Sequence, residues 1–167
     1  MLAKALQLYQ QNYGDTLKLF WAGRQDMSQD SLMEWQEINN LFSRDPHLSS
    51  NWRWLGERSD ISQLLGSCDA LIHVSLYEGL PNVICEAFIA GRPVIASAVC
   101  DHPLLVEEGV RGLLCDPLSP ESICEAIERF VALPLEKRQE MGCNARHYAE
   151  EHLTLQRMVD DYEALLH

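Results

Sequence analysis

The sequence predicts a protein of the α/β class, in which helices flank a parallel β-sheet. Short apolar segments alternate with segments of helical periodicity along the 167 residues. Two of the apolar segments, 71–74 and 93–97, show little alternation between apolar and polar residues, which is typical of strands covered on both faces. Because successive strands are separated by helices, right-handed crossovers and a parallel sheet are expected.

The amino-terminal third is expected to contain three helices and two strands. A helix over 1–13 carries apolar residues at helical spacing, and a strand over 17–22 ends at Gly23. A helix over 30–42 has Asp30 or Ser31 as its N-cap, and a polar loop through Asp45-Pro46 leads to a strand at 52–55. Ser59 or Asp60 then caps a short helix that reaches Leu65.

The remaining elements follow the same alternation. Strands are expected at both ends of 71–97 and at 112–116, with helices over 81–90, 103–108, 119–131, 135–152 and 154–166. Ser119 and Pro120 form an N-cap followed by a proline at the first helical position. The loops after the strands all open on one edge of a parallel sheet, where ligands bind in this class of fold. Arg92 lies at the opposite edge, so we expect it to be structural.

Composition excludes several functions. A formal charge of −12 argues against binding to nucleic acid or to anionic membrane surfaces. No apolar run is long enough to cross a bilayer, and residues 1–12 lack the features of a signal peptide. The six cysteines have neither C-x-x-C pairs nor histidine partners at zinc spacing, so we expect a reducing cytoplasm and no structural metal.

Two glutamates, Glu78 and Glu86, are separated by seven residues around the predicted helix over 81–90. Pro81 suits the first helical position, and Gly91 suits its end. Glu86 and Asn82 share the face opposite the expected core positions. A solvated helix face is one interpretation of Glu86, and a face that lines a binding cleft is the other, favoured by the apolar residues that flank it.

The amino end of this helix is also a candidate phosphate site. Its first N–H groups lack intrahelical acceptors, and Gly79 allows close approach of the backbone. Glu86 lies five residues beyond Pro81, or about 7.5 Å at 1.5 Å per residue. A diphosphate at the helix end would leave room for a ribose beside Glu86 and a sugar near Glu78, because carboxylates accept hydrogen bonds from hydroxyl groups.

The segment Glu78-Gly79-Leu80-Pro81-Asn82 through Glu86, followed by Ala90 to Ser97, resembles the E-x7-E signature of the family 4 glycosyltransferases. The segments 54–61, 68–70 and 109–117 occur in the family's order and spacing, so the resemblance covers nearly the whole chain. It implies the C-terminal, donor-binding half of a retaining enzyme with the two Rossmann-like domains of the GT-B architecture. Residues 1–167 would form that single domain.

The resemblance also implies roles for individual residues. Glu78 would contact the transferred sugar as the catalytic residue, and Glu86 would bind the ribose. Donor-binding positions near them are Gly79, Leu80, Pro81, Asn82 and Val83. The backbone of Arg58 would contact the base, although a solvated loop arginine remains an alternative. The implied reaction is hexosyl transfer from a UDP- or GDP-sugar in polysaccharide biosynthesis, without a metal or other cofactor, in the cytoplasm or at the inner membrane face.

The sequence departs from this family in three respects. The first strand, with its Gly-Arg and following Lys, is absent, and Arg24 follows the second strand, so it is not assigned to that role. The N-terminal acceptor domain is also absent, so we expect a fragment that is inactive alone and self-associates through an incomplete sheet. A non-catalytic binding or interaction module that needs a partner domain is the alternative. The usual Gly-Gly is replaced within 99–103, where we expect His102 to be solvated.

Overall fold

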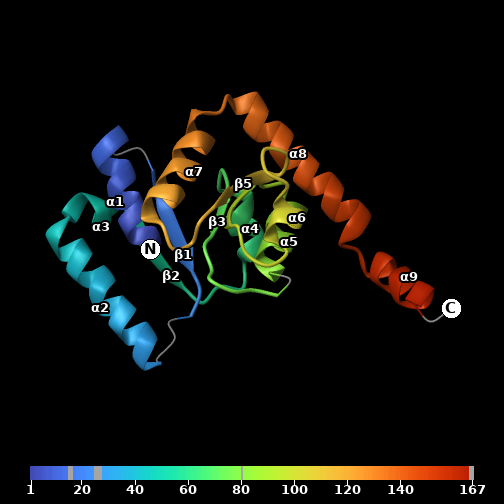
Figure 1. Cartoon of the computed structure of the whole chain (residues 1–167), viewed down its shortest axis with the longest axis horizontal. Coiled ribbons are helices and arrows are strands. Elements are labelled where there is room, and N and C mark those ends of the chain that lie inside the picture. Colours follow the sequence, from blue (N-terminus) through green and yellow to red (C-terminus); the bar gives the residue numbers. More distant parts are fainter. Residues whose placement is uncertain (15–16, 25–27, 80, 166–167) are drawn as a thin grey trace. The chain divides into compact units, whose positions relative to one another are not determined.

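The computed structural model describes residues 1–14, 17–24, 28–79 and 81–165. Figure 1 shows the helices and strands along the chain. The chain divides into two compact units, Met1–Ile61 and Ser62–His167, which are described separately below. The assignment of residues 1–167 to a single domain stays a prediction.

The described residues of the first unit form a pair of parallel strands and three helices. The helices are α1 (Leu2–Tyr13), α2 (Gln29–Arg44) and α3 (Pro46–Asn51), and the strands are β1 (Leu19–Ala22) and β2 (Trp52–Gly56). Strand β1 pairs with β2 with Leu19 opposite Trp52. The ring of Trp52 stacks on that of Trp21 at 5.6 Å between centroids. Trp52 is buried and Trp21 is 40% exposed, so the stacked pair joins the two strands at the border of the packed region.

The N-caps in this unit differ from those predicted. Ser28 caps α2 by accepting a hydrogen bond from the Ser31 N–H, so the helix begins earlier than expected and Ser31 is not the cap. The polar loop predicted after Asp45 is wrong, because Pro46 opens helix α3. Asp45 caps α3 by accepting a hydrogen bond of 3.0 Å from the Leu48 N–H. Leu48, which is 2% exposed, packs this six-residue helix against the rest of the unit.

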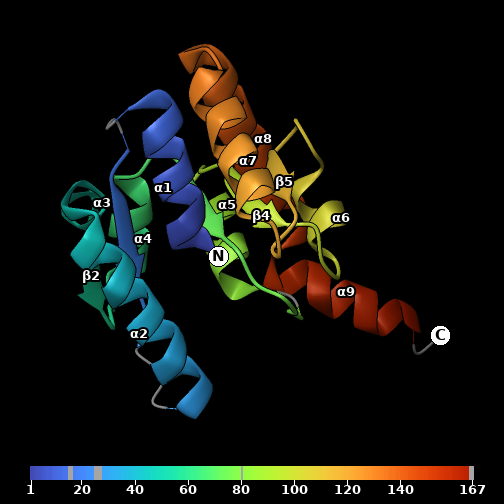
Figure 2. The same cartoon turned by 60° about the vertical axis from the view of Figure 1, so that its left-hand side comes forward.

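The second unit holds a parallel sheet in the order β3-β4-β5. Its strands are β3 (Leu71–His73), β4 (Val94–Ser97) and β5 (Gly112–Cys115). Helix α4 (Ile61–Gly66) begins at the boundary, and α5 (Asn82–Ile89), α6 (His102–Val106), α7 (Pro120–Ala132), α8 (Leu135–His152) and α9 (Leu155–Leu165) follow. Figure 2 shows α5, α6 and α7 gathered around the strands. The predicted α/β class, a parallel sheet flanked by helices, is confirmed.

The core of the second unit is built around β4, the central strand. All four of its residues are buried, as the near absence of alternation between apolar and polar residues predicted. Ile84 and Phe88 of α5 and Ile123 and Ile127 of α7 are also fully or almost fully buried. Ser119 caps α7, with Pro120 at the helix start as predicted. Helix α8 packs along α5, which fixes the helix that carries Glu86.

Strands β1 and β3 each have one partner in the part of the chain that the structure describes. Strand β1 pairs with β2, and β3 pairs with β4. Edge strands of this kind can pair with another strand. Self-association through them stays a prediction.

All six cysteines, which lie within the described ranges, are free thiols. Among the described helices, none combines the length and apolar character needed to cross a membrane.

Candidate functional site

Glu78 lies in the loop that follows β3 in the second unit. Its side chain is 35% exposed, and its Oε1 atom lies 3.4 Å from Nε2 of His73 at the end of that strand. A parallel strand delivers its carboxyl end to the edge where ligands bind in open α/β sheets. The structure therefore brings a partly shielded carboxylate and a histidine together where the sequence predicted the sugar-contacting residue.

The start of α5 differs by one position from the prediction. Pro81 is the N-cap, with φ −77° and ψ 108°, and is not the first helical residue. Its carbonyl oxygen accepts hydrogen bonds from the N–H groups of Ile84 (3.0 Å) and Cys85 (3.3 Å). Asn82 and Val83 therefore provide the N–H groups that a helix leaves without intrahelical acceptors. Pro81 has no N–H and cannot donate a backbone hydrogen bond to a ligand. Its contribution to the predicted donor-binding residues would be to fix the direction of the turn.

The exposed side of α5 carries the polar residues predicted for it. Asn82 and Glu86 are exposed, whereas Ile84, Ala87 and Phe88 are fully buried. Val83 is partly buried, and Ile89 is 51% exposed, so the helix is covered on one side and is not enclosed all round within the described residues. A cleft beside Glu86 stays a prediction. Gly79 is exposed, and Leu80 lies outside the residues that the structure describes.

Gly91 ends α5 as predicted. Its φ of +66° lies in the left-handed region, which glycine adopts without strain. The N–H of Arg92 donates to the Ala87 carbonyl at 2.8 Å, and the N–H of Gly91 donates to the Phe88 carbonyl at 2.9 Å. This pair of bonds is a Schellman motif, which satisfies the last carbonyl groups of the helix. The Arg92 guanidinium donates to the Gly66 carbonyl, in agreement with the structural role expected for it.

A buried serine joins the loop before Glu78 to the end of β4. The Ser97 hydroxyl accepts a hydrogen bond of 2.8 Å from the Ser75 N–H and donates one of 2.7 Å to the Ser75 carbonyl. Ser97 has no solvent exposure. Both bonds go to the same backbone residue, so this side chain holds the loop three residues before Glu78.

His102 is buried, which contradicts the prediction of a solvated loop histidine. It is the first residue of α6 and has no solvent exposure. Its Nδ1 atom lies 2.8 Å from the Ser97 carbonyl oxygen, and its ring centroid lies 5.6 Å from that of His73. These contacts join the start of α6 to the ends of β4 and β3. Sequence analysis missed His73 altogether, although a histidine within an apolar strand was an available signal.

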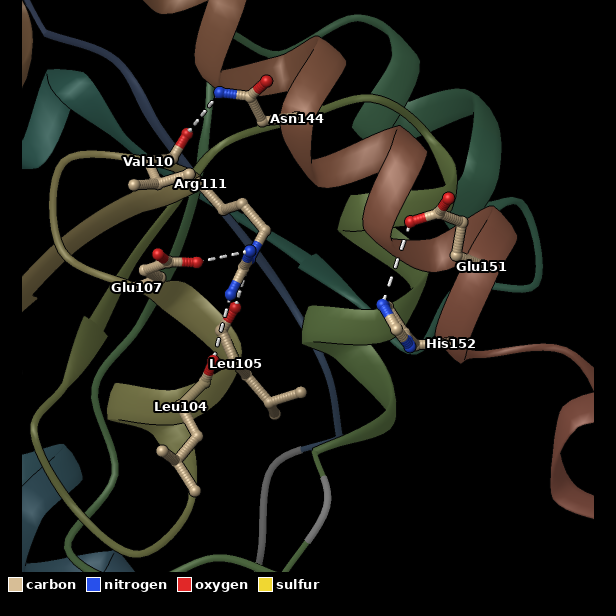
Figure 3. Close-up of polar contacts among 8 residues, drawn as sticks. All are labelled: Leu104, Leu105, Glu107, Val110, Arg111, Asn144, Glu151 and His152. Carbon is tan, nitrogen blue, oxygen red and sulfur yellow. Dashed lines mark hydrogen bonds and ion pairs between the residues drawn. The ribbon is translucent and has the colours of Figure 1, made fainter. Parts of the chain in front are cut away.

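The far end of α6 is fixed by a buried arginine, as Figure 3 shows. Arg111 is 8% exposed, and its guanidinium donates to the carbonyl oxygens of Leu105 (2.7 Å) and Leu104 (3.0 Å). It also forms an ion pair of 2.7 Å with Glu107. A charged donor thus satisfies the last carbonyl groups of the helix that carries His102.

Arg58 belongs to the first unit. Its guanidinium binds the Asp60 carboxylate through two hydrogen bonds on an exposed surface. These bonds favour the ionised carboxylate and lower the pKa of Asp60. Arg24 forms a similar exposed pair with Glu57, so it is engaged within the same unit. The predicted contact of Arg58 with a base stays a prediction.

The second unit also has a groove away from the α5 start, and its described residues form no metal-binding cluster. A groove of about 670 Å³ includes Gly91 and Arg92 at the carboxyl end of α5, together with Arg138 and Arg146, and lies away from the α5 start. Among the described residues, no group of three or more His, Cys, Asp or Glu side chains is arranged to hold a metal ion.

The chain is similar in sequence to several glycosyltransferases. A family model described as "Glycosyl transferases group 1" matches residues 1–132. Lipopolysaccharide glucosyltransferase WaaG of Escherichia coli K12 is 33% identical over 103 residues, which are 60% of this chain and 27% of WaaG. The N-acetyl-alpha-D-glucosaminyl L-malate synthase of Bacillus anthracis is 26% identical over 130 residues, 78% of this chain and 32% of that protein.

A solved structure shares the fold over almost the whole chain. The structure of Anabaena Alr3699/HepE in complex with UDP-glucose has a TM-score of 0.84 and 25% sequence identity. The match covers 99% of this chain and 43% of that one. The chain thus spans less than half the length of these relatives. The family match, which extends through both glutamates and β5, establishes that the chain belongs to the group 1 glycosyl transferases.

Proposed function

We propose that this chain is the donor-binding part of a GT-B glycosyltransferase of family 4 that transfers a sugar from a nucleoside diphosphate with retention of configuration. The observation that carries the proposal is the arrangement around α5. Glu78 precedes its N-terminus, Glu86 follows on its exposed side, and the whole segment lies within the family match. The match to a UDP-glucose complex supports a nucleotide sugar as the ligand.

Each part of this arrangement has a defined task in the proposed reaction. Glu86 accepts hydrogen bonds from the ribose hydroxyl groups, and Glu78 accepts them from the transferred sugar. The N–H groups of Asn82 and Val83, with the positive end of the helix dipole, receive the diphosphate. When the glycosidic bond breaks, the diphosphate takes the electron pair, so stabilising this leaving group lowers the barrier. No metal ion is required of the donor site in this proposal.

The relatives narrow the substrate class. WaaG is named a glucosyltransferase of lipopolysaccharide, and HepE was solved with UDP-glucose. We therefore favour a UDP-hexose over a GDP-sugar, and an acceptor in polysaccharide biosynthesis. The protein would work in the cytoplasm or at the inner membrane face. Because the matched regions are less than half of these relatives, the acceptor would bind elsewhere, and this chain alone would have no turnover.

Kinetics of the complete protein that carries this chain test the proposal. The Glu86→Ala variant should raise the donor KM by about tenfold or more, because a hydrogen bond to a charged group contributes about 1.5–3 kcal/mol. Gln139→Ala, an exposed change on α8, is the control and should leave the KM unchanged. Proton NMR of the product should show the donor's anomeric configuration. An unchanged KM in Glu86→Ala would remove Glu86 from the site, and an inverted product would rule out retention.

A further inference from the structure

Three buried side-chain atoms at the Glu78 end of the sheet have no hydrogen-bond partner in the described structure. They are Nε2 of His73, Oγ of Ser75 and Nε2 of His102. Buried polar groups are almost always hydrogen-bonded, because leaving one unpaired costs free energy. Three such atoms from neighbouring segments therefore indicate a place where the hydrogen bonds are completed by water, by a ligand or by a side chain that moves closer when a ligand binds.

The tautomer of His102 follows from its surroundings. A carbonyl oxygen can only accept a hydrogen bond, so Nδ1, at 2.8 Å from the Ser97 oxygen, must carry a proton. Nε2 of the same ring is buried and has no hydrogen-bond partner in the described structure, so the bond from Nδ1–H to Ser97 is the hydrogen bond that orients the ring.

His73 lies between this buried ring and Glu78. Burial lowers the pKa of His73, the Glu78 carboxylate opposes that shift, and His102 adds to it. Helix α5 packs against β3 and contributes two more titratable side chains, the exposed Glu86 and Cys85, whose pKa is raised by burial. A neutral His73 at neutral pH has one N–H to donate, and the Glu78 carboxylate, whose Oε1 atom lies 3.4 Å from Nε2, is an acceptor.

We propose that His73, backed by His102, is a positioning residue for Glu78: its Nε2–H donates to the carboxylate and aims it at the transferred sugar. The inference rests on the donor-binding function proposed above. The separation of 3.4 Å is long for a hydrogen bond, and contacts of this kind often shorten only when substrate binds. Arg111 holds helix α6, which carries His102, and Ser97 holds the loop that follows His73. Both histidine rings are therefore on segments that buried side chains fix in place.

Histidine titration tests the contact without any donor. Two-dimensional NMR of the 167-residue chain should give a His73 pKa that falls in Glu78→Gln, because the carboxylate that favours the protonated ring is lost. The pKa of exposed His147, which pairs with Glu151, is the internal control and should not move. An unchanged His73 pKa would overturn the proposed coupling, whatever the chain binds.

Donor binding then tests the positioning role. Affinities for UDP-glucose and UDP are compared in wild type, His73→Leu and His73→Gln, because glutamine keeps an N–H donor that does not titrate. His73→Leu should weaken UDP-glucose by about tenfold while leaving UDP unchanged, and His73→Gln should restore most of the loss. In a Glu78→Gln background, His73→Leu should have no further effect.

The outcomes separate the two proposals. Equal weakening of UDP and UDP-glucose, or failure of the folded glutamine variant to rescue, would contradict the positioning role. Thermal unfolding of each variant shows whether it is folded. If wild type binds neither ligand, the donor-binding function fails, while the histidine titration still decides whether His73 and Glu78 are coupled.

Discussion

The guanidinium carbon of Arg111 lies 4.2 Å from the centre of the Tyr148 ring. Arg111 follows α6 and Tyr148 belongs to α8, so this cation–π contact joins the segment after α6 to α8 within the second unit. Asn144, one turn earlier on α8, donates to the Val110 carbonyl at 3.2 Å. The segment after α6 is therefore held by a buried charge, an aromatic face and a side-chain amide.

Replacing Arg111 by methionine should destabilise the chain by about 2 kcal/mol, because it leaves buried carbonyl groups unpaired and removes the ring contact. Urea denaturation measures the free energy of unfolding. The control is Arg129→Met, which breaks an exposed ion pair with Glu108 and should cost about 1 kcal/mol or less. Equal losses in the two variants would contradict the assignment of Arg111 as a buried clamp.

Asp45 makes the stability of the first unit depend on pH. The hydrogen bond from the Leu48 N–H lowers the Asp45 pKa below its ordinary 3.8, burial opposes this shift, and Gln7 adds to it. Since the folded pKa lies below the unfolded one, the stabilisation is present above about pH 3.8 and is lost as pH falls through the folded value.

The Asp45→Ala variant should therefore lose about 1 kcal/mol at neutral pH, as is typical of a helix N-cap. Denaturant titrations at several pH values should show this difference shrinking below about pH 4. Ser28→Ala removes the N-cap of α2, which does not titrate, and its effect should stay constant over that range. A constant effect for Asp45→Ala as well would show that its carboxylate charge contributes nothing.

Gly142 allows α8 to approach the end of α5. A Cβ atom at this position would lie 2.4 Å from the Gly91 carbonyl oxygen. The Gly142→Ala variant should lose about 1–3 kcal/mol in urea denaturation, because backbone must move to relieve the overlap. At Gly66, also helical, a Cβ atom meets nothing within 4 Å, so Gly66→Ala should be neutral or stabilising. A neutral Gly142→Ala would show that α8 adjusts freely.

Local signals predicted most of the helix and strand positions. Apolar runs gave β3, β4 and β5, and the caps Ser119 and Gly91 act as expected. Helix α3 was missed because residues 46–51 contain one buried apolar side chain and no helical pattern of apolar residues. Its start depends on Asp45 and Pro46, which form a capping signal although the sequence predicted a polar loop there.

The candidate site was predictable where its residues lie on one segment. Glu78, Asn82 and Glu86 surround the start of α5 as their spacing predicted. The histidine pair was not predictable, because His73 and His102 lie on separate segments and their rings come together, with centroids 5.6 Å apart, only in the folded chain. His102 is buried because it contacts Ser97 and His73, whereas its neighbours Cys100 and Asp101 are exposed. The residue types in this segment do not indicate that difference.

Calorimetric titration of the 167-residue chain with UDP-glucose, and with GDP-glucose in parallel, tests the central claim most directly. We expect saturable binding of one UDP-glucose per chain, weaker binding of GDP-glucose, and about tenfold or greater loss of UDP-glucose affinity in Glu86→Gln. Gln139→Ala should bind as wild type does. No binding of either nucleotide sugar by the folded chain, or equal affinity in wild type and Glu86→Gln, would contradict a donor site at α5.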